Sequence, residues 1–237
     1  MENTSVKIGP HIKAIVWDLD GTIINSFHIM KALVREIALE EGLPIPSSES
    51  FLINYHGTLR ETIHTLLAAE LTDAELDRLM DKFLLKQVRY YDSVAEHLIE
   101  DAVGLLKRAR HAGLKQVLVT NRLHAGHANA SPRAIVASSV LKNYLDTIIC
   151  GDDAPVRKPD PNVLAAFLKE NGLSPKQVLI VGDQFVDAQL AMNLGTQCVL
   201  VNRDRVELAH MEKLGDNWQD HLTIVQSLHD VYIANNP

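Results

Sequence analysis

The hydrophobic positions of the chain fall into short continuous runs rather than an alternating pattern. Five such runs hold five or six residues each, contain Val or Ile, and are followed at once by Asp, Asn or Gly. Continuous apolar runs are typical of strands that are buried on both faces of a parallel sheet. We therefore predict strands over residues 12–17, 115–120, 146–150, 177–182 and 197–201.

Helical patterns lie between the later runs. Residues 102–112 are apolar at helical spacing, and Gly113 follows them. A second helix is predicted to start at Asp160, a favoured N-cap, with Pro161 in the first helical position and Gly172 as the terminator. Strands that alternate with helices predict an α/β fold with a doubly wound, Rossmann-like parallel sheet.

The interval between the first two strands is much longer than a crossover requires. Residues 27–115 contain no convincing strand, although a crossover needs only about a dozen residues. Residues 29–39 are apolar at helical spacing, and Thr72 with Glu75 forms a capping-box pattern before another apolar stripe. The sequence therefore predicts an inserted helical domain.

We place the inserted domain at residues 27–95 and the sheet domain at residues 1–26 and 96–237. The two connections, at residues 25–26 and 91–94, are the expected hinges. Residues 223–231 carry a sparse apolar pattern, from which we expect a last helix.

Charge and composition narrow the class of partner. The 237 residues include 30 Asp and Glu against 23 Lys and Arg, a formal net charge of -7. Such a chain lacks the clustered basic footprint of a nucleic-acid-binding protein. It has neither a signal-like N-terminus nor an apolar run near the roughly 20 residues of a membrane helix. We expect a cytoplasmic monomer or homodimer that binds a small molecule, not a membrane or a nucleic-acid polymer, with Cys150 and Cys198 as buried free thiols.

Four of the predicted strands lead into segments that carry polar residues. One Asp after a strand is usually a turn former or a helix cap, but four such segments in one chain indicate a site. Ligands of open α/β sheets bind beyond the carboxyl ends of the strands. The candidate residues are, in chain order, Asp18, Asp20, Gly21, Thr22, Thr120, Asn121, Lys158, Asp183 and Asp187.

These segments resemble the four motifs of the haloacid dehalogenase superfamily, over residues 12–202. "DLDGT" is similar to the first motif, "VLVTN" to the second, the lysine of "RKPDP" to the third and "GDQFVD" to the fourth. The presence of Asp20 is typical of the phosphatases and phosphomutases of the superfamily, because the dehalogenase branch lacks this second aspartate. The whole is most similar to the phosphoglycolate phosphatase-like group with a helical cap.

The resemblance implies a phosphoryl-transfer site. Asp18 would be the nucleophile that forms an acyl phosphate, and Asp20 would protonate the leaving oxygen and then deprotonate the attacking water. The side chains of Asp18 and Asp183 and the backbone carbonyl of Asp20 would hold Mg²⁺. Asp187 completes the acidic set, where it would hold a water near the metal or the lysine; alternatively, it only favours the dipole of the following helix.

The residue types support a cation independently of the resemblance. Up to four carboxylates would face a phosphate dianion, and Lys158 alone cannot offset their charge. Hard oxygen ligands favour Mg²⁺ over zinc. We expect the catalytic residues Thr120 and Lys158 to hold the phosphate oxygens and stabilise their charge. Substrate binding is assigned to Gly21, Thr22 and Asn121.

The inserted helices correspond to a cap that would close over the site and select the substrate. The segment "YHGTLRE" matches a substrate loop of these phosphatases in position, and Arg60 within it could pair with a substrate carboxylate. Equally, Arg60 could be a surface arginine that pairs with Glu61 or another helix residue. The chain departs from its relatives at Asn25, where many have Asp, and at residues 122–133, a longer loop without their usual lysine after the Asn.

Three functions stay open at this point. The first is a Mg²⁺-dependent phosphatase acting on a small phosphomonoester, such as phosphoglycolate, a sugar phosphate or a nucleotide. The second is a phosphomutase of the β-phosphoglucomutase type, which would differ mainly in the cap. The third is a non-catalytic phospho-ligand binder, which the intact set of catalytic positions disfavours.

Overall fold

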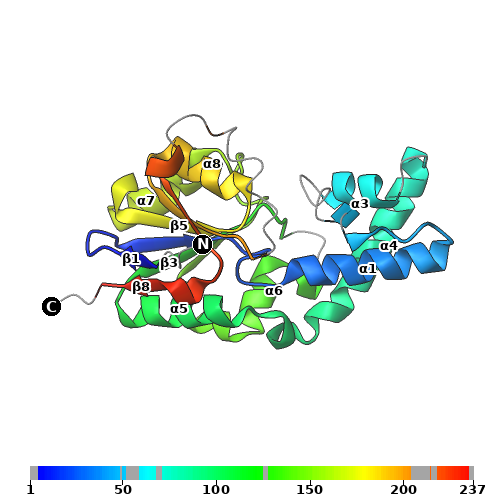
Figure 1. The fold of residues 1–237 in the computed structure, drawn as a ribbon, viewed down its shortest axis with the longest axis horizontal. Coiled ribbons are helices and arrows are strands. Elements are labelled where there is room, and N and C mark those ends of the chain that lie inside the picture. Colours follow the sequence, from blue (N-terminus) through cyan, green and yellow to red (C-terminus); the bar gives the residue numbers. More distant parts are fainter. Residues whose placement is uncertain are drawn as a thin grey trace.

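The computed structural model describes residues 5–48, 50–51, 59–67, 71–124, 128–203, 214 and 218–234. Its centre is a six-stranded parallel sheet with the strand order β4-β3-β2-β5-β6-β7 (Figure 1). The strands are β2 (Ala14–Trp17), β3 (Lys115–Val119), β4 (Thr147–Ile149), β5 (Val178–Gly182), β6 (Gln197–Val201) and β7 (Leu222–Val225). All five predicted strands are present, and the predicted doubly wound α/β fold is confirmed.

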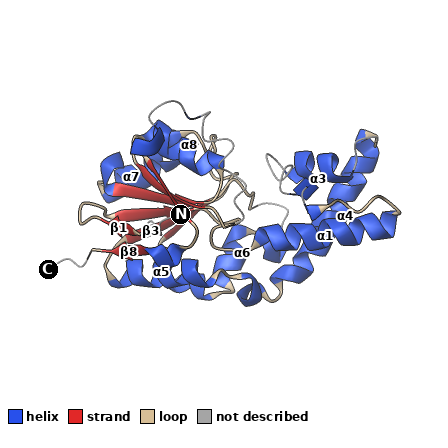
Figure 2. Cartoon of the chain, in the orientation of Figure 1, coloured by secondary structure: helices blue, strands red, loops and turns tan. Residues whose placement is uncertain are grey.

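Helices cover both faces of this sheet (Figure 2). Val16 and Ile180 face a core that includes Phe167, whereas Trp17 packs on the other face with Leu105. Successive strand residues point to opposite faces, so one strand serves both cores. The described helices are α1 (Ser26–Glu41), α3 (Leu59–Leu67), α4 (Asp73–Tyr91), α5 (Glu100–His111), α6 (Pro132–Ala137), α7 (Ala165–Asn171) and α8 (Phe185–Leu194).

The register of the sheet determines which residues meet at its carboxyl edge. Trp17, the last residue of β2, is aligned with Leu118 of β3 and with Val181 of β5. The next residue, Asp18, donates its backbone N–H to the carbonyl of Val181 at 2.9 Å. The polar segments after β2, β3 and β5 therefore emerge side by side, as open α/β sheets require of a ligand site.

Helices α1, α3 and α4 lie together at one end of the molecule, beyond the carboxyl edge of the sheet (Figure 1). The capping box predicted at Thr72 and Glu75 is present at the start of α4. Buried Leu33 and Phe83 belong to the apolar face between these helices. We keep the division into a sheet domain and a helical domain at residues 27–95 as a proposal.

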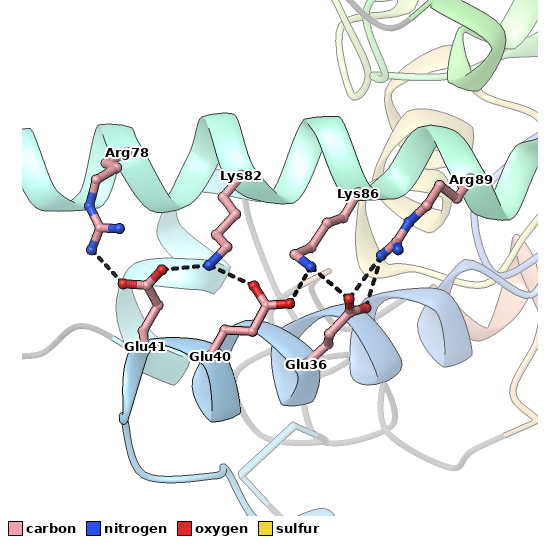
Figure 3. A network of polar contacts seen from close by, with 7 residues as sticks. All are labelled: Glu36, Glu40, Glu41, Arg78, Lys82, Lys86 and Arg89. Carbon is pink, nitrogen blue, oxygen red and sulfur yellow. Dashed lines mark hydrogen bonds and ion pairs between the residues drawn. The ribbon is translucent and has the colours of Figure 1, made fainter.

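A ladder of ion pairs lines the polar side of the contact between α1 and α4 (Figure 3). Lys86 contacts both Glu36 and Glu40 at 2.6 Å. Ion pairs at a partly exposed surface contribute little individually and are screened by salt, so we infer that the apolar face provides most of the stability of this contact. The seven ladder residues are Glu36, Glu40, Glu41, Arg78, Lys82, Lys86 and Arg89.

The prediction of a helix over residues 223–231 is wrong. This segment contains most of β7, a 3-10 turn over Leu228–Asp230 and the start of β8 (Val231–Ile233). Strand β8 pairs with β1 (Val6–Ile8) in a separate parallel pair, which the sequence analysis also missed. None of β1, β7 and β8 lies in an apolar run as long as those that predicted β2 and β4, and these strands form because a partner strand lies beside them.

Cys150 and Cys198 are buried free thiols, as predicted. Within the described part of the chain, none of the helices combines the length and the apolar character needed to cross a membrane.

Candidate active site

Three carboxylates from two loops gather at the carboxyl edge of the sheet. Asp18 follows β2, whereas Asp183 and Asp187 follow β5, and one oxygen of each lies within 4.8 Å of the others. Asp18 and Asp187 are buried, with 7% and 1% of their surface exposed. Carboxylates this close and this buried repel one another unless a cation or a proton offsets their charge.

Lys158 supplies one positive charge to this cluster. Its Nζ donates to Oδ1 of Asp18 at 2.5 Å and to Oδ1 of Asp187 at 2.7 Å. Burial alone would lower the pKa of Lys158, but the charges of Asp18 and Asp187 raise it above its ordinary value. The lysine therefore stays charged, and the structure brings Asp187 to the lysine, one of the roles considered for it.

One positive charge does not offset three carboxylates. Burial raises the pKa of Asp18 to about 7, against the opposing charge of Lys158. Burial, followed by the charge of Asp18, also raises the pKa of Asp183 well above its ordinary value. The donors are hard carboxylate oxygens in excess of the available positive charge, and this set fits a divalent cation such as Mg²⁺.

The loop of Gly21 and Thr22 packs directly against Asp183. Thr22 is fully buried, and its hydroxyl donates to Oδ1 of Asp183 at 2.8 Å. Gly21 has a φ of +84, and a Cβ at this position would lie 2.0 Å from Oδ2 of Asp183. Glycine is required here for both reasons. Thr22, which we assigned to substrate binding, holds a carboxylate of the cluster through its side chain.

Thr120 and Asn121 follow β3 and reach two different parts of the site. Thr120 is buried, and its hydroxyl oxygen accepts from the backbone N–H of Arg122 at 3.1 Å. The side chain of Asn121 accepts from the backbone N–H of Lys158 and donates to its carbonyl, both at 3.0 Å. Asn121 thus fixes the loop that carries Lys158 through a pair of hydrogen bonds.

Asp20 has a partner that the sequence analysis did not identify. Arg122 forms a fork on its carboxylate: Nε donates to Oδ2 at 3.0 Å, and Nη2 donates to Oδ1. Both side chains are largely buried, with 10% of Arg122 and 22% of Asp20 exposed. The available signal was the arginine directly after Asn121, where relatives usually have lysine, but the sequence does not show which carboxylate it meets.

Arg60 lies in α3 and pairs within the inserted helices. Its guanidinium contacts Asp73 at 3.1 Å and also Asp77, both in α4. These contacts match the alternative of a surface arginine paired with another helix residue, and its role in substrate binding stays a prediction. Residues 55–58 of the expected substrate loop lie outside the described residues.

The two connections between the sheet and the inserted helices run side by side. The backbone N–H of Asn25 donates to the carbonyl of His97 at 2.9 Å, and that of Ile99 donates to the carbonyl of Ile23 at 2.8 Å. Ile24 and Leu98 form an antiparallel bridge between them. The second of these segments lies a few residues after the hinge predicted at residues 91–94, and the hinge role of the two connections stays a prediction.

The doubly wound sheet, the inserted helices and the buried Asp–Lys cluster define an α/β enzyme with its site at the carboxyl ends of the strands. The chain belongs to the family of haloacid dehalogenase-like hydrolases, which it matches over residues 15–201. The predicted family and the predicted enzyme class, a phosphoric monoester hydrolase, are confirmed.

Individual relatives agree with this assignment. The phosphoglycolate phosphatase of Thiobacillus denitrificans is 28% identical over 78% of this chain and 80% of its own length. The phosphoglycolate phosphatase of Cereibacter sphaeroides is 30% identical over 78% of this chain and 83% of its own length. The crystal structure of a predicted phosphoglycolate phosphatase from Haemophilus somnus has a TM-score of 0.73 at 21% identity, and the match covers 93% of this chain and 96% of that one.

Proposed function

We propose that this protein is a Mg²⁺-dependent phosphatase that hydrolyses a small phosphomonoester through an aspartyl-phosphate intermediate on Asp18. The observation that carries the proposal is the cluster that buried Asp18 and Asp187 form with half-buried Asp183 and with Lys158. A carboxylate held by a lysine beside further carboxylates has the parts needed to attack a phosphate ester when a cation is bound.

The proposed reaction has two steps. In the first, an oxygen of Asp18 attacks phosphorus, and the ester oxygen leaves with a proton from Asp20. In the second, water attacks the same phosphorus while Asp20 takes up a proton, and Asp18 is released. Lys158 stabilises the negative charge in both steps, and the Thr120 hydroxyl is available to a phosphate oxygen.

The side chains of Asp18 and Asp183 and the backbone carbonyl of Asp20 would hold Mg²⁺. When bound, the ion would offset the charge of the phosphate oxygens and the carboxylates. Asp187 supports this arrangement by holding Lys158 at 2.7 Å.

Phosphoglycolate is the first substrate to test, because the relatives of similar length carry that name. Sugar phosphates and nucleoside monophosphates are the next candidates. The measurement is release of inorganic phosphate from 2-phosphoglycolate, a sugar phosphate, a nucleoside monophosphate and p-nitrophenyl phosphate, with Mg²⁺ and with EDTA. We expect net phosphate release that EDTA removes and Mg²⁺ restores.

Asp18→Asn is the decisive variant for the proposed chemistry. We expect a loss of at least ~10³-fold in kcat on every ester, as for other removed nucleophiles. The variant should stay folded, because burial already raises the pKa of Asp18 to about 7. Substantial Mg²⁺-dependent turnover by folded Asp18→Asn would contradict the nucleophile assignment. Transfer to a second position through a bisphosphate, without net phosphate release, would identify a phosphomutase instead.

A further inference from the structure

The Asp20–Arg122 pair is part of a longer set of contacts that reaches the inserted helices. Besides its fork on Asp20, Arg122 donates from Nη2 to the hydroxyl oxygen of Tyr91 at 2.9 Å and from Nη1 to the carbonyl of Ala130 at 3.0 Å. Its guanidinium carbon also lies 5.1 Å from the centre of the Tyr91 ring. The guanidinium is therefore held by three separate segments of the chain.

These contacts connect the sheet edge to the base of α4. Tyr91 is the last residue of α4, and Ala130 ends the short 3-10 helix Ala128–Ala130 after β3. Asn129 from this turn donates to the carbonyl of Val88 in α4 at 3.0 Å and to Asp92 at 2.5 Å. The loop after β3 therefore holds the last turn of α4, and Arg122 lies between that turn and Asp20.

We propose that Arg122 is a positioning residue for Asp20. Through its contact with Tyr91, the position of the Arg122 guanidinium depends on the end of α4. This inference rests on the proposed function, in which Asp20 transfers the proton of the leaving group. The carboxylate of Asp20 faces Arg122, whereas Asp18, Asp183 and Asp187 form the cluster with Lys158. The direction of the Asp20 side chain is thus set by the guanidinium and, through Tyr91, by the end of α4.

Misplacing a proton donor affects some substrates more than others. The p-nitrophenolate ion leaves without a proton, whereas an alkoxide needs one during bond cleavage. Loss of orientation can cost on the order of 10²-fold in rate. A positioning role for Arg122 therefore predicts a loss of kcat that depends on the leaving group. Loss of folding or of phosphate binding would instead affect all esters alike.

The experiment compares kcat and KM on p-nitrophenyl phosphate and on the best alkyl phosphate of the substrate panel. Arg122→Gln removes the fork, Arg122→Lys keeps the charge with a single donor group, and Tyr91→Phe removes only the hydroxyl contact. Asp20→Asn is the reference variant: it shows how strongly kcat depends on the leaving group when the proton donor is removed. Arg110→Gln is the matched control, because Arg110 pairs with Asp146 at the opposite end of the strands.

We expect Arg122→Gln to lower kcat about 10- to 100-fold on the alkyl ester and only a few-fold on p-nitrophenyl phosphate. Arg122→Lys and Tyr91→Phe should show smaller losses with the same dependence, and Arg110→Gln should match wild type. If Arg122→Gln does not fold, the leaving-group dependence of Arg122→Lys and Tyr91→Phe tests the positioning role.

Equal losses on both esters, or a rise in KM alone, would overturn the positioning role. They would instead indicate substrate binding or a purely structural contact. Wild-type protein without phosphatase activity, or Asp20→Asn without leaving-group dependence, would overturn the proposed function as well. The two failures are distinguishable because the second is visible without any Arg122 variant.

Discussion

Asp183 shows how one residue joins two motifs of the site. One carboxylate oxygen accepts a hydrogen bond from the Thr22 hydroxyl, and the other packs against Gly21. Burial and the neighbouring charge of Asp18 raise its pKa, so its ionised form is costly in the absence of a cation. A bound divalent cation would remove that cost, and Asp183 should therefore report on metal binding directly.

Asp183→Asn should abolish the stabilisation of the protein by Mg²⁺. Wild-type protein at about ten times the Mg²⁺ dissociation constant should gain about 1.4 kcal/mol, or roughly 3–5 °C in Tm. The metal-free variant should melt at or above the wild-type temperature, since Asn can still accept from Thr22 and carries no buried charge. Thermal melts with EDTA and with added Mg²⁺ measure both effects.

Asp160→Asn is the control for this experiment. Asp160 caps the 3-10 helix that follows Lys158, and Asn can serve the same cap. An undiminished Mg²⁺ shift in Asp183→Asn would show that this carboxylate does not hold the ion.

Helix α4 is the element that, in the proposed function, would connect the inserted helices to Asp20. Its first turn is closed by the capping box of Thr72 and Glu75, and its last residue, Tyr91, contacts Arg122. Its apolar face packs toward α1, and the ion-pair ladder of Figure 3 joins the same two helices along the polar side of that contact. A rigid helix with contacts at both ends can transmit a displacement of the inserted helices to the site.

Thr72→Ala should loosen the start of α4. The loss of the hydroxyl acceptor should lower the local free energy of opening by about 1 kcal/mol. Hydrogen exchange of the amides in the first turn measures this change, with phosphatase activity on p-nitrophenyl phosphate as a second readout that should stay near wild type. Thr65→Ala is the control, because its hydroxyl only bonds back to the carbonyl of Glu61 within α3. Equal exchange in both variants would contradict the role of the cap.

At the scale of the whole molecule, Asp101 ties distant segments together at the start of α5. It accepts from the Ser227 hydroxyl at 2.6 Å and from the backbone N–H of Leu228 at 2.8 Å, and it pairs with Arg203. Arg203 also donates to the carbonyl of Gly21 at 3.3 Å, in the loop that follows β2. The C-terminal segment is therefore connected to the site through one buried carboxylate.

Asp101→Asn should destabilise the protein in a pH-dependent way. Burial on its own would raise the pKa of Asp101, but the hydrogen bond from Ser227 and the charge of Arg203 outweigh it, so the pKa lies below its ordinary value. Its stabilisation is present above the unfolded-state pKa near 4 and is lost as the pH falls through the lower folded-state value. At pH 7 we expect a free energy of unfolding about 1.5–3 kcal/mol lower than wild type.

Urea denaturation from pH 7 down to about 3 measures this difference. The difference between the two proteins should shrink as the pH falls toward the folded-state pKa of Asp101, because the wild-type carboxylate then takes up a proton in the folded state too. Asp230→Asn, in the same C-terminal segment, controls for the removal of a carboxyl group. A difference between Asp101→Asn and wild type that stays constant with pH would contradict the ionic role.

The amino-acid sequence by itself determined the type and approximate ends of most central elements. Apolar runs, the capping box at Thr72 and the terminator Gly172 are local signals, and their physical causes act within a few residues. For the same reason the sequence located Asp18 and Asp183 directly after strands and Lys158 in the loop that follows another strand. It did not reveal β1, β7 or β8, because these strands lack a long apolar run and depend on a neighbouring strand.

Only the tertiary structure decided which side chains meet. Lys158 reaches Asp18 across 140 positions of the chain, and Arg122 reaches Asp20 across 102. The packing of α3 on α4 places Arg60 next to Asp73 and Asp77, and no local sequence pattern predicts this pairing. Residue type and spacing describe what a segment can do, but pairing at this range depends on strand order and register, which arise only when the whole sheet assembles.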